Sequence, residues 1–196
     1  STADWNEDGW ADLILGSSGG ALRGWVNNQG EGFDMVTLPW TMGSETKAIV
    51  WLDLDNDGDD DLFIQEASGR CGLFRNDGDM SFTDMTNVFG LDSHLPQDYT
   101  EAAGVSFGDM DNDGDLDLHL CRYLEYAPTD GPADRNVLLR NEGNFVFTDV
   151  STSSGIDIYL RLSFQSIWWD HNGDGWQDIF VINDKNGANA LFENQG

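Results

Sequence analysis

The sequence of 196 residues has few basic side chains: 9 Lys and Arg stand against 36 Asp and Glu, so the formal net charge at pH 7 is -27. Binding to phosphate needs clustered Lys and Arg, so this balance makes nucleic acid a poor partner and excludes an anionic membrane surface. No apolar run approaches the roughly 18 residues of a membrane-spanning helix, so we expect no membrane insertion. The hydrophobic content is nevertheless 39%, with 8 Trp and 11 Phe, which predicts a folded core.

Two further features are scarce, a leader segment and cysteine. The sequence begins at Ser1 without Met and without a basic or apolar leader, so we expect no signal peptide and a mature or excised piece. Cys71 and Cys121 fit either one disulfide or two buried thiols, because sequence alone does not place their Cα atoms within the about 7 Å that a bridge requires.

An acidic stretch of nine residues with the pattern D-x-[DN]-x-D-G-x-x-D occurs four times, starting at Asp4, Asp53, Asp109 and Asp170. Short β-branched or aromatic runs flank the copies, such as residues 49–52 before the second copy and 62–64 after it. A third run then leads into a Gly-containing turn, and a fourth reads Phe-Thr-Asp at 82–84 and 147–149. Four short strands per repeat predict an all-β protein: a β-propeller, or an arc of one, of about four antiparallel four-stranded blades with an acidic loop between strands 1 and 2.

We expect residues 1–196 to form a single propeller region, with repeats at about 1–47, 48–103, 104–164 and 165–196 and with incomplete terminal blades. Residues 1–3 leave almost no first strand before the first loop, and residues 194–196 stand where the last blade should turn into its fourth strand. Unpaired strand edges recruit other strands. Three arrangements therefore stay open: a fragment of a larger propeller, self-association of copies through blade edges, and a closed four-bladed monomer.

Each acidic loop is typical of a chain that wraps around a hard cation. Carboxylates or amides alternate at loop positions 1, 3 and 5, Gly follows at position 6, and Ca²⁺ takes about six to eight oxygen ligands. The EF-hand shares this beginning but needs a bidentate Glu at position 12, where this chain has Leu15, Ile64, Leu120 and Val181. Every copy instead has Asp at position 9. The competing interpretation is a solvated acidic turn, but four like charges about 4 Å apart repel one another unless a cation offsets them.

We therefore predict about four Ca²⁺ ions, held by the side chains at positions 1, 3, 5 and 9 and by the carbonyl oxygen at position 7. In chain order the candidate metal ligands are Asp4, Asn6, Asp8, Trp10 and Asp12; Asp53, Asp55, Asp57, Asp59 and Asp61; Asp109, Asp111, Asp113, Asp115 and Asp117; and Asp170, Asn172, Asp174, Trp176 and Asp178.

The second repeat carries a family resemblance most completely, through its acidic loop, the run at 62–64, the Leu-Phe-Arg-Asn-Asp-Gly at 73–78 and the Phe-Thr-Asp at 82–84. The chain resembles the FG-GAP/VCBS repeat family, the Ca²⁺-binding propeller blades of integrin α heads, and is most similar to bacterial secreted members and the cartilage acidic protein group. The resemblance implies Ca²⁺ in the loop between strands 1 and 2, an extracellular or cell-surface location, and adhesion or ligand binding. Family propellers usually close with about seven blades, whereas this chain supplies four.

These observations predict a Ca²⁺-stabilised extracellular module for binding, adhesion or assembly, with a protein or a glycan as its ligand. The tryptophans keep a lectin-like alternative open, because exposed aromatic side chains beside Ca²⁺ suit a glycan surface, and Trp10 and Trp176 share one loop position. The simpler interpretation is packing between blades, which we expect above all for Trp51, Trp168 and Trp169.

We expect no enzymatic activity. No nucleophile signature surrounds His94, His119 or His171, and His171, at loop position 2, is expected to point away from the metal. An abundance of carboxylates always offers pairs for glycoside chemistry, so a propeller-framed polysaccharide hydrolase or lyase remains the least favoured alternative.

Overall fold

The computed structural model describes residues 1–19, 21–38, 40, 43–87, 101–123, 135–157, 162–184 and 188–196, with the side chains of 101 and 102 excepted. Within these ranges the chain forms three four-stranded sheets and one three-stranded sheet, all antiparallel and each built from consecutive strands. The first sheet holds β1 (Thr2–Ala3), β2 (Asp12–Leu15), β3 (Arg23–Asn27) and β4 (Phe33–Val36), and the second holds β5 (Thr46–Leu52), β6 (Asp61–Glu66), β7 (Cys71–Asn76) and β8 (Phe82–Asp84). The third sheet holds β9 (Glu101–Gly108), β10 (Asp117–Tyr123), β11 (Val137–Asn141) and β12 (Phe147–Asp149), and the fourth holds β13 (Ser163–Trp169), β14 (Asp178–Asn183) and β15 (Ala190–Phe192).

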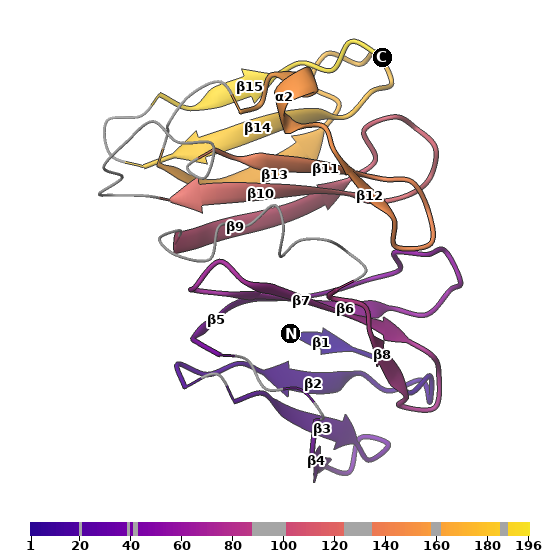
Figure 1. Ribbon diagram of the computed structural model, residues 1–196. Helices are drawn as coiled ribbons and strands as arrows, with labels where there is room; N and C mark the ends of the chain where they lie inside the picture. Colours follow the sequence, from indigo (N-terminus) through magenta and orange to yellow (C-terminus); the bar gives the residue numbers. More distant parts are fainter. Residues whose placement is uncertain are drawn as a thin grey trace.

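The four sheets stack in chain order as an open arc, from the indigo first sheet to the yellow fourth sheet in Figure 1. An all-β arc of antiparallel sheets is the predicted fold class, and it is confirmed. The short apolar runs expected to be strands lie within β5 to β15, because β-branched and aromatic side chains suit a pleated surface buried on both sides. In β6 all six residues are buried, as expected for a strand between two neighbouring sheets.

Two local features differ from the sequence expectation. Thr2 and Ala3 do form a leading strand, β1, in which Thr2 pairs with Leu13 and Ala3 with Asp12. A helical turn, α2 (Ser151–Ser154), follows β12 and ends at Gly155, whose φ of 74° provides a left-handed C-cap. No helix in the described ranges has the length and apolar character needed to cross a membrane.

Three apolar clusters fill the spaces between successive sheets. The first two sheets meet around Trp5, Ile14 and Leu62, and the second and third around Leu54, Phe63, Leu73, Leu118 and Leu139. The third and fourth sheets meet around Cys121, Leu138, Ile156, Ile179 and Val181. The core is therefore divided among the interfaces, and each sheet is stabilised mainly by its neighbours.

The tryptophans expected between sheets divide into two groups. Trp51 packs against Trp5 with ring centroids 5.4 Å apart, and Trp168 belongs to the cluster between the third and fourth sheets. A Cβ at Gly108 would lie 2.4 Å from the Trp168 ring, so glycine is required where these sheets approach closely. Trp169 is 39% exposed, and its predicted place in the inter-sheet core is wrong, because it lies on the opposite face of β13 from Trp168.

No disulfide joins Cys71 and Cys121. Cys71 is buried between the second and third sheets and Cys121 between the third and fourth, so the two thiols belong to different interfaces. Burial raises the pKa of the Cys121 thiol to about 12, which makes it unreactive. Of the two alternatives that the sequence left open, the structure has buried thiols.

An asparagine at or just after the end of the third strand connects each of the second, third and fourth sheets to the loop of the preceding sheet. The Nδ2 of Asn141 donates to the carbonyl oxygens of Leu116 in its own sheet (3.3 Å) and Leu54 in the preceding loop (3.1 Å). The side-chain amide of Asn76 donates in the same way to the carbonyl oxygens of Asp60 in its own sheet and Trp5 in the preceding loop. The side-chain amide of Asn194 donates to those of Gln177 in its own sheet and Met110 in the preceding loop. Asn27, in the first sheet, donates to Ala11 of its own sheet.

The Asn141→Ala variant should lower the free energy of unfolding by about 2 kcal/mol, because the buried carbonyl oxygen of Leu54 and the half-buried one of Leu116 lose their donor. The matched Asn27→Ala variant should cost about half as much, since its amide spans no sheet interface. Urea denaturation followed by circular dichroism measures both. Equal losses would show that the inter-sheet bond contributes nothing beyond the local one.

Candidate metal centres in the acidic loops

The four acidic loops share one backbone conformation. Position 6 has φ near +90° in every copy, at Gly9 (90°), Gly58 (100°), Gly114 (93°) and Gly175 (92°). Position 4 is also left-handed, at Glu7 (57°), Asn56 (60°), Asn112 (58°) and Gly173 (78°). Residues other than glycine and asparagine rarely adopt this region, so the repeated Gly at position 6 is explained by the backbone.

Backbone N–H groups turn the carboxylates toward the inside of each loop. The position-1 carboxylate accepts a hydrogen bond from the position-6 N–H in all four copies, at 2.8, 3.0, 3.1 and 2.9 Å for Asp4, Asp53, Asp109 and Asp170. The position-5 carboxylate accepts from the position-7 N–H, at 2.9, 3.0, 2.9 and 2.9 Å for Asp8, Asp57, Asp113 and Asp174. The alternating pattern in the sequence therefore becomes a ring of inward-facing oxygens.

The position-9 carboxylates are fully buried, with Asp12, Asp61, Asp117 and Asp178 each 0% exposed. In the second loop, Asp61 accepts the N–H of Leu54 at Oδ2 (3.0 Å) and the N–H of Asn76 at Oδ1 (2.9 Å). Asp117 is held in the same way by Met110 (2.6 Å) and Asn141 (2.8 Å). Sequence analysis missed this second role, in which position 9 joins the loop to the third strand of its sheet.

The second and third loops bring three carboxylates together. Ligand oxygens of Asp53, Asp55 and Asp61 all lie within 4.8 Å of one another, and so do those of Asp109, Asp111 and Asp117. At position 3, the buried Oδ1 atoms of Asp55 and Asp111 have no hydrogen-bond donor among the described residues. A buried oxygen of this kind, in a cluster of like charges, fits a hard divalent cation.

The electrostatics of these clusters favour a cation. The pKa of Asp61 is raised to about 7, mainly by burial and also by the charges of Asp55 and Asp57, although the two backbone N–H groups lower it. The pKa of Asp117 is raised to about 7 for the same reasons. Desolvation and the neighbouring carboxylates also raise the pKa values of Asp55 and Asp111. Bound positive charge would lower all four pKa values and stabilise the ionised cluster.

The first and fourth loops have an amide at position 3. The Nδ2 of Asn6 donates to Asp8 (3.2 Å), and that of Asn172 donates to Asp174 (2.8 Å). In the fourth loop, Nδ1 of His171 lies 2.6 Å from Oδ2 of Asp178, so this ring contacts the position-9 carboxylate. At positions 1, 3, 5 and 9, these two loops carry one carboxylate fewer than the middle two.

Neighbouring loops touch one another along one edge of the stacked sheets. Asn56, at position 4 of the second loop, donates to Asp115 at position 7 of the third (2.5 Å). Asn112 donates to the carbonyl oxygen of Gly175 in the fourth loop (3.0 Å). Between the first and second loops, two acidic residues, Glu7 and Asp59, occupy the corresponding positions. The hydrogen bond with Asp59 and its negative charge raise the pKa of Glu7. The loops therefore form a continuous acidic row.

The aromatic and histidine candidates do not assemble a site. Trp10 is 43% exposed and Trp176 is partly buried, and they lie in the first and fourth loops with two sheets between them. The ring of His119 is buried with its Nδ1 2.6 Å from Ser166 Oγ, and burial lowers its pKa to about 3. His94 lies outside the described residues.

A family model of the FG-GAP-like repeat matches residues 4–64 and 53–120, which together span more than half of the chain. The chain belongs to the FG-GAP-like repeat family. The first match contains the first and second acidic loops, and the second match contains the second and third. The FG-GAP repeats of this chain thus coincide with the loops that gather the carboxylates.

A solved structure supports the same fold. A chain in the crystal structure of BBS1N in complex with ARL6DN, soaked with lead, superposes with a TM-score of 0.55 at 12% sequence identity. The match covers 100% of this chain and 56% of that chain, so this chain spans little more than half of the BBS1N β-propeller chain. At this identity the similarity concerns the fold alone. No curated protein sequence matches the chain significantly.

The dual role of position 9 is tested by Asp61→Asn in metal-free buffer. The amide leaves one backbone N–H without an acceptor, so the free energy of unfolding should fall by about 1–3 kcal/mol. The control Asp57→Asn keeps an oxygen for the N–H of Asp59 and should leave metal-free stability almost unchanged. Urea denaturation in a chelator compares the two. Equal effects would mean that position 9 has no structural role of its own.

Proposed function

We propose that this FG-GAP repeat protein is an extracellular binding module whose arc is stabilised by Ca²⁺ in the acidic loops. The observation that carries the proposal is the pair of clusters in the second and third loops, each with three converging carboxylates and a buried position-3 oxygen without a donor. Ca²⁺ suits such sites because it accepts many carboxylate and carbonyl oxygens in a flexible geometry. The family is one of binding and interaction modules, which agrees with a role in recognition.

In the second and third loops the ion would be held by the acidic side chains at positions 1, 3, 5 and 9, with the carbonyl oxygen of position 7 as a further ligand. Asn6 and Asn172 would replace one carboxylate in the outer loops, so weaker binding is expected there. When bound, the ion supplies positive charge and no chemistry. Four ions would bring the formal charge from -27 to -19, since each adds +2.

Ca²⁺ binding would act on the whole arc, because the loops touch one another and are joined to the neighbouring sheets. The amide of Asn141 reaches the second loop at Leu54, while its own N–H is held by Asp117 of the third loop. Neutralising a cluster therefore stiffens an inter-sheet joint. The result is a rigid support that leaves blade surfaces and edges for ligands, and we propose no catalysis.

The proposed partner is a protein. The fold neighbour BBS1N is in complex with ARL6DN, which is an example of protein recognition by a chain of similar fold. The lectin-like alternative depends on Trp10 and Trp176 acting together, and two sheets separate them. We propose an extracellular location, because Ca²⁺ sites of extracellular modules bind at about 10⁻⁴–10⁻³ M and fill only where Ca²⁺ is millimolar.

Removal of Ca²⁺ should lower the melting temperature markedly. In roughly 2 mM Ca²⁺, four sites with such affinities would add roughly 3–7 kcal/mol to the free energy of unfolding, because the ions bind the folded state alone. Thermal melts with Ca²⁺ and with EDTA measure the difference. An unchanged melting temperature would contradict the metal assignment.

Asp57→Ala and Asp113→Ala should each reproduce part of the chelator effect, with a smaller Ca²⁺-dependent shift than the parent chain. Asp34→Ala is the control, since Asp34 is exposed on β4 outside the loops and its loss removes the same charge. If Asp34→Ala reduced the shift equally, general charge screening would explain the effect of Ca²⁺.

A further inference from the structure

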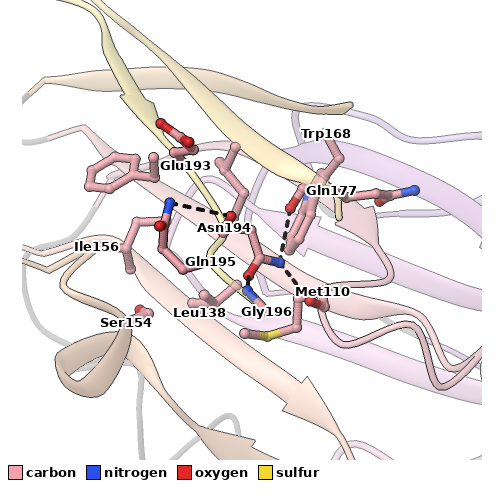
Figure 2. Close-up of a pocket in the computed structure, with 12 residues that line it drawn as sticks. Met110, Leu138, Ser154, Ile156, Trp168, Gln177, Glu193, Asn194, Gln195 and Gly196 are labelled. Atoms are coloured by element: carbon pink, nitrogen blue, oxygen red, sulfur yellow. Dashed lines mark hydrogen bonds between the residues drawn. The ribbon is translucent and has the colours of Figure 1, made fainter. Parts of the chain in front are cut away.

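One position in each sheet differs in charge from sheet to sheet, although the acidic loops beside it are nearly alike. In the fourth sheet it is Glu193, which directly precedes Asn194 at the edge of a cavity of about 310 Å³, where Asn194 donates to Met110 and Gln177 (Figure 2). In chain order the residues directly before the four asparagines, called flanking residues below, are Val26, Arg75, Arg140 and Glu193.

In the third sheet the flanking residue approaches the loop at position 3. The Nε of Arg140 lies 3.9 Å from Oδ2 of Asp111, while Oδ1 of Asp111 is buried and has no hydrogen-bond donor among the described residues. The guanidinium also donates to Oε1 of Glu142 (2.6 Å), which holds it beside the loop. One oxygen of Asp111 therefore faces the arginine, and the other is directed into the acidic cluster.

The second loop repeats this arrangement. Asp55, at position 3, also has a buried Oδ1 without a donor among the described residues. Burial and the neighbouring aspartates raise the pKa of Asp55, and the positive charge of Arg75 opposes this rise. Arg75 is itself held by Asp77, with Nη2 2.7 Å from Oδ1. Both middle loops therefore combine an aspartate at position 3 with a flanking arginine.

The fourth loop has the opposite combination, an amide at position 3 and a flanking acid. The Nδ2 of Asn172 donates to Oε1 of Glu193 (3.2 Å) and to Oδ2 of Asp174 (2.8 Å). The Oδ1 of Asn172 accepts the N–H of Asp174 (2.9 Å) and, as a carbonyl oxygen, keeps a second lone pair for a cation. Because an amide offers its oxygen to a cation only when its NH₂ group turns elsewhere, Glu193 provides an acceptor that this orientation needs.

The first loop shows the same asparagine without such an acceptor. It has the same residue types as the fourth loop at positions 1, 3, 5, 6, 7 and 9, but its flanking residue is Val26, whose side chain accepts no hydrogen bond. The Nδ2 of Asn6 donates to Asp8 (3.2 Å) and to no other group among the described residues. The position-3 amide is therefore held from two sides in the fourth loop and from one side in the first.

We propose that the flanking residue positions the position-3 ligand of its Ca²⁺ loop. A flanking arginine holds the outer oxygen of an aspartate, and the flanking Glu193 holds the amide nitrogen of Asn172, so that in both cases the inner oxygen faces the ion. Partners that hydrogen-bond a metal ligand from outside orient it, and their loss typically costs about 10–100-fold in affinity. The inference rests on the proposed Ca²⁺ sites and deepens them, because Glu193 offsets the carboxylate that the fourth loop lacks at position 3.

Two substitutions of Glu193 separate positioning from charge, because both remove the same negative charge. Glu193→Gln keeps an oxygen acceptor for Asn172, whereas Glu193→Leu does not, so Leu should weaken Ca²⁺ binding at the fourth loop about tenfold more than Gln. Titration of the 196-residue chain followed by ¹H–¹⁵N NMR resolves the loops, because the N–H of Gly175 bonds to Asp170 and reports on the fourth loop. Equal affinities of the two variants would overturn the proposal.

An exchange of the pair tests the same rule by rescue. Glu193→Arg places a donor opposite the NH₂ group of Asn172 and should weaken the fourth site by about tenfold or more. Adding Asn172→Asp recreates the combination of Asp111 with Arg140 and should recover most of this loss. A double variant that binds no more tightly than Glu193→Arg would overturn the proposed pairing.

The other loops serve as controls within each molecule. The position-6 amides of Gly58 and Gly114 should titrate in every variant as in the parent chain, which shows that the variants fold. Asp34→Asn removes one charge from exposed β4 and should leave the affinity read at Gly175 unchanged. If Ca²⁺ shifts none of the position-6 amides of the parent chain, the metal assignment and this inference both fail. If it shifts them but the Glu193 variants bind like the parent chain, the positioning role alone is refuted.

Discussion

The structure depends on the buried aspartate at position 9 of each acidic loop. In the second and third sheets this carboxylate accepts one backbone N–H from its own loop and another from the third-strand asparagine, whose amide reaches back to the preceding loop. One side chain thereby connects the loop, the second strand, the third strand and the neighbouring sheet. Because a buried carboxylate without partners is costly, these contacts must form together. The repeat is therefore a cooperative unit whose acidic residue cannot be separated from its fold.

The same arrangement concentrates negative charge. Holding Asp61 inside the sheet places it beside Asp53 and Asp55, and burial raises its pKa to about 7. A structural need thus creates an electrostatic cost that a bound cation would relieve, so one short motif can serve both as a fold element and as the proposed metal site. The contacts between successive loops then join the acidic clusters along the arc, so the proposed binding of ions would couple stability across the sheets.

The open arc has a second consequence. In the first two spaces between sheets, a side chain from the fourth strand, β8 or β12, takes part in the packing. The cavity between the third and fourth sheets is lined by Met110, Trp168, Ile179 and a partly buried Phe192. A repeat protein satisfies each interface from neighbouring elements, so the packing of each sheet depends on the strands beside it. The acidic loops and the inter-sheet packing are in this sense products of one repeating unit.

The sequence by itself determined the repeating unit, because its signals are local. The spacing of Asp53, Asp55, Asp57 and Gly58 dictates a tight loop with inward oxygens, and the apolar runs around it dictate short strands, so the all-β arc and the converging carboxylates were predictable. Only the tertiary structure decided what each side chain faces. It placed Trp168 in the core and its neighbour Trp169 outside, put Cys71 and Cys121 in different interfaces, and joined Asn141 to Leu54. It also left the cavity beside Phe192. These outcomes depend on which sheet lies opposite, and packing between residues far apart in the chain leaves no local pattern from which to infer them.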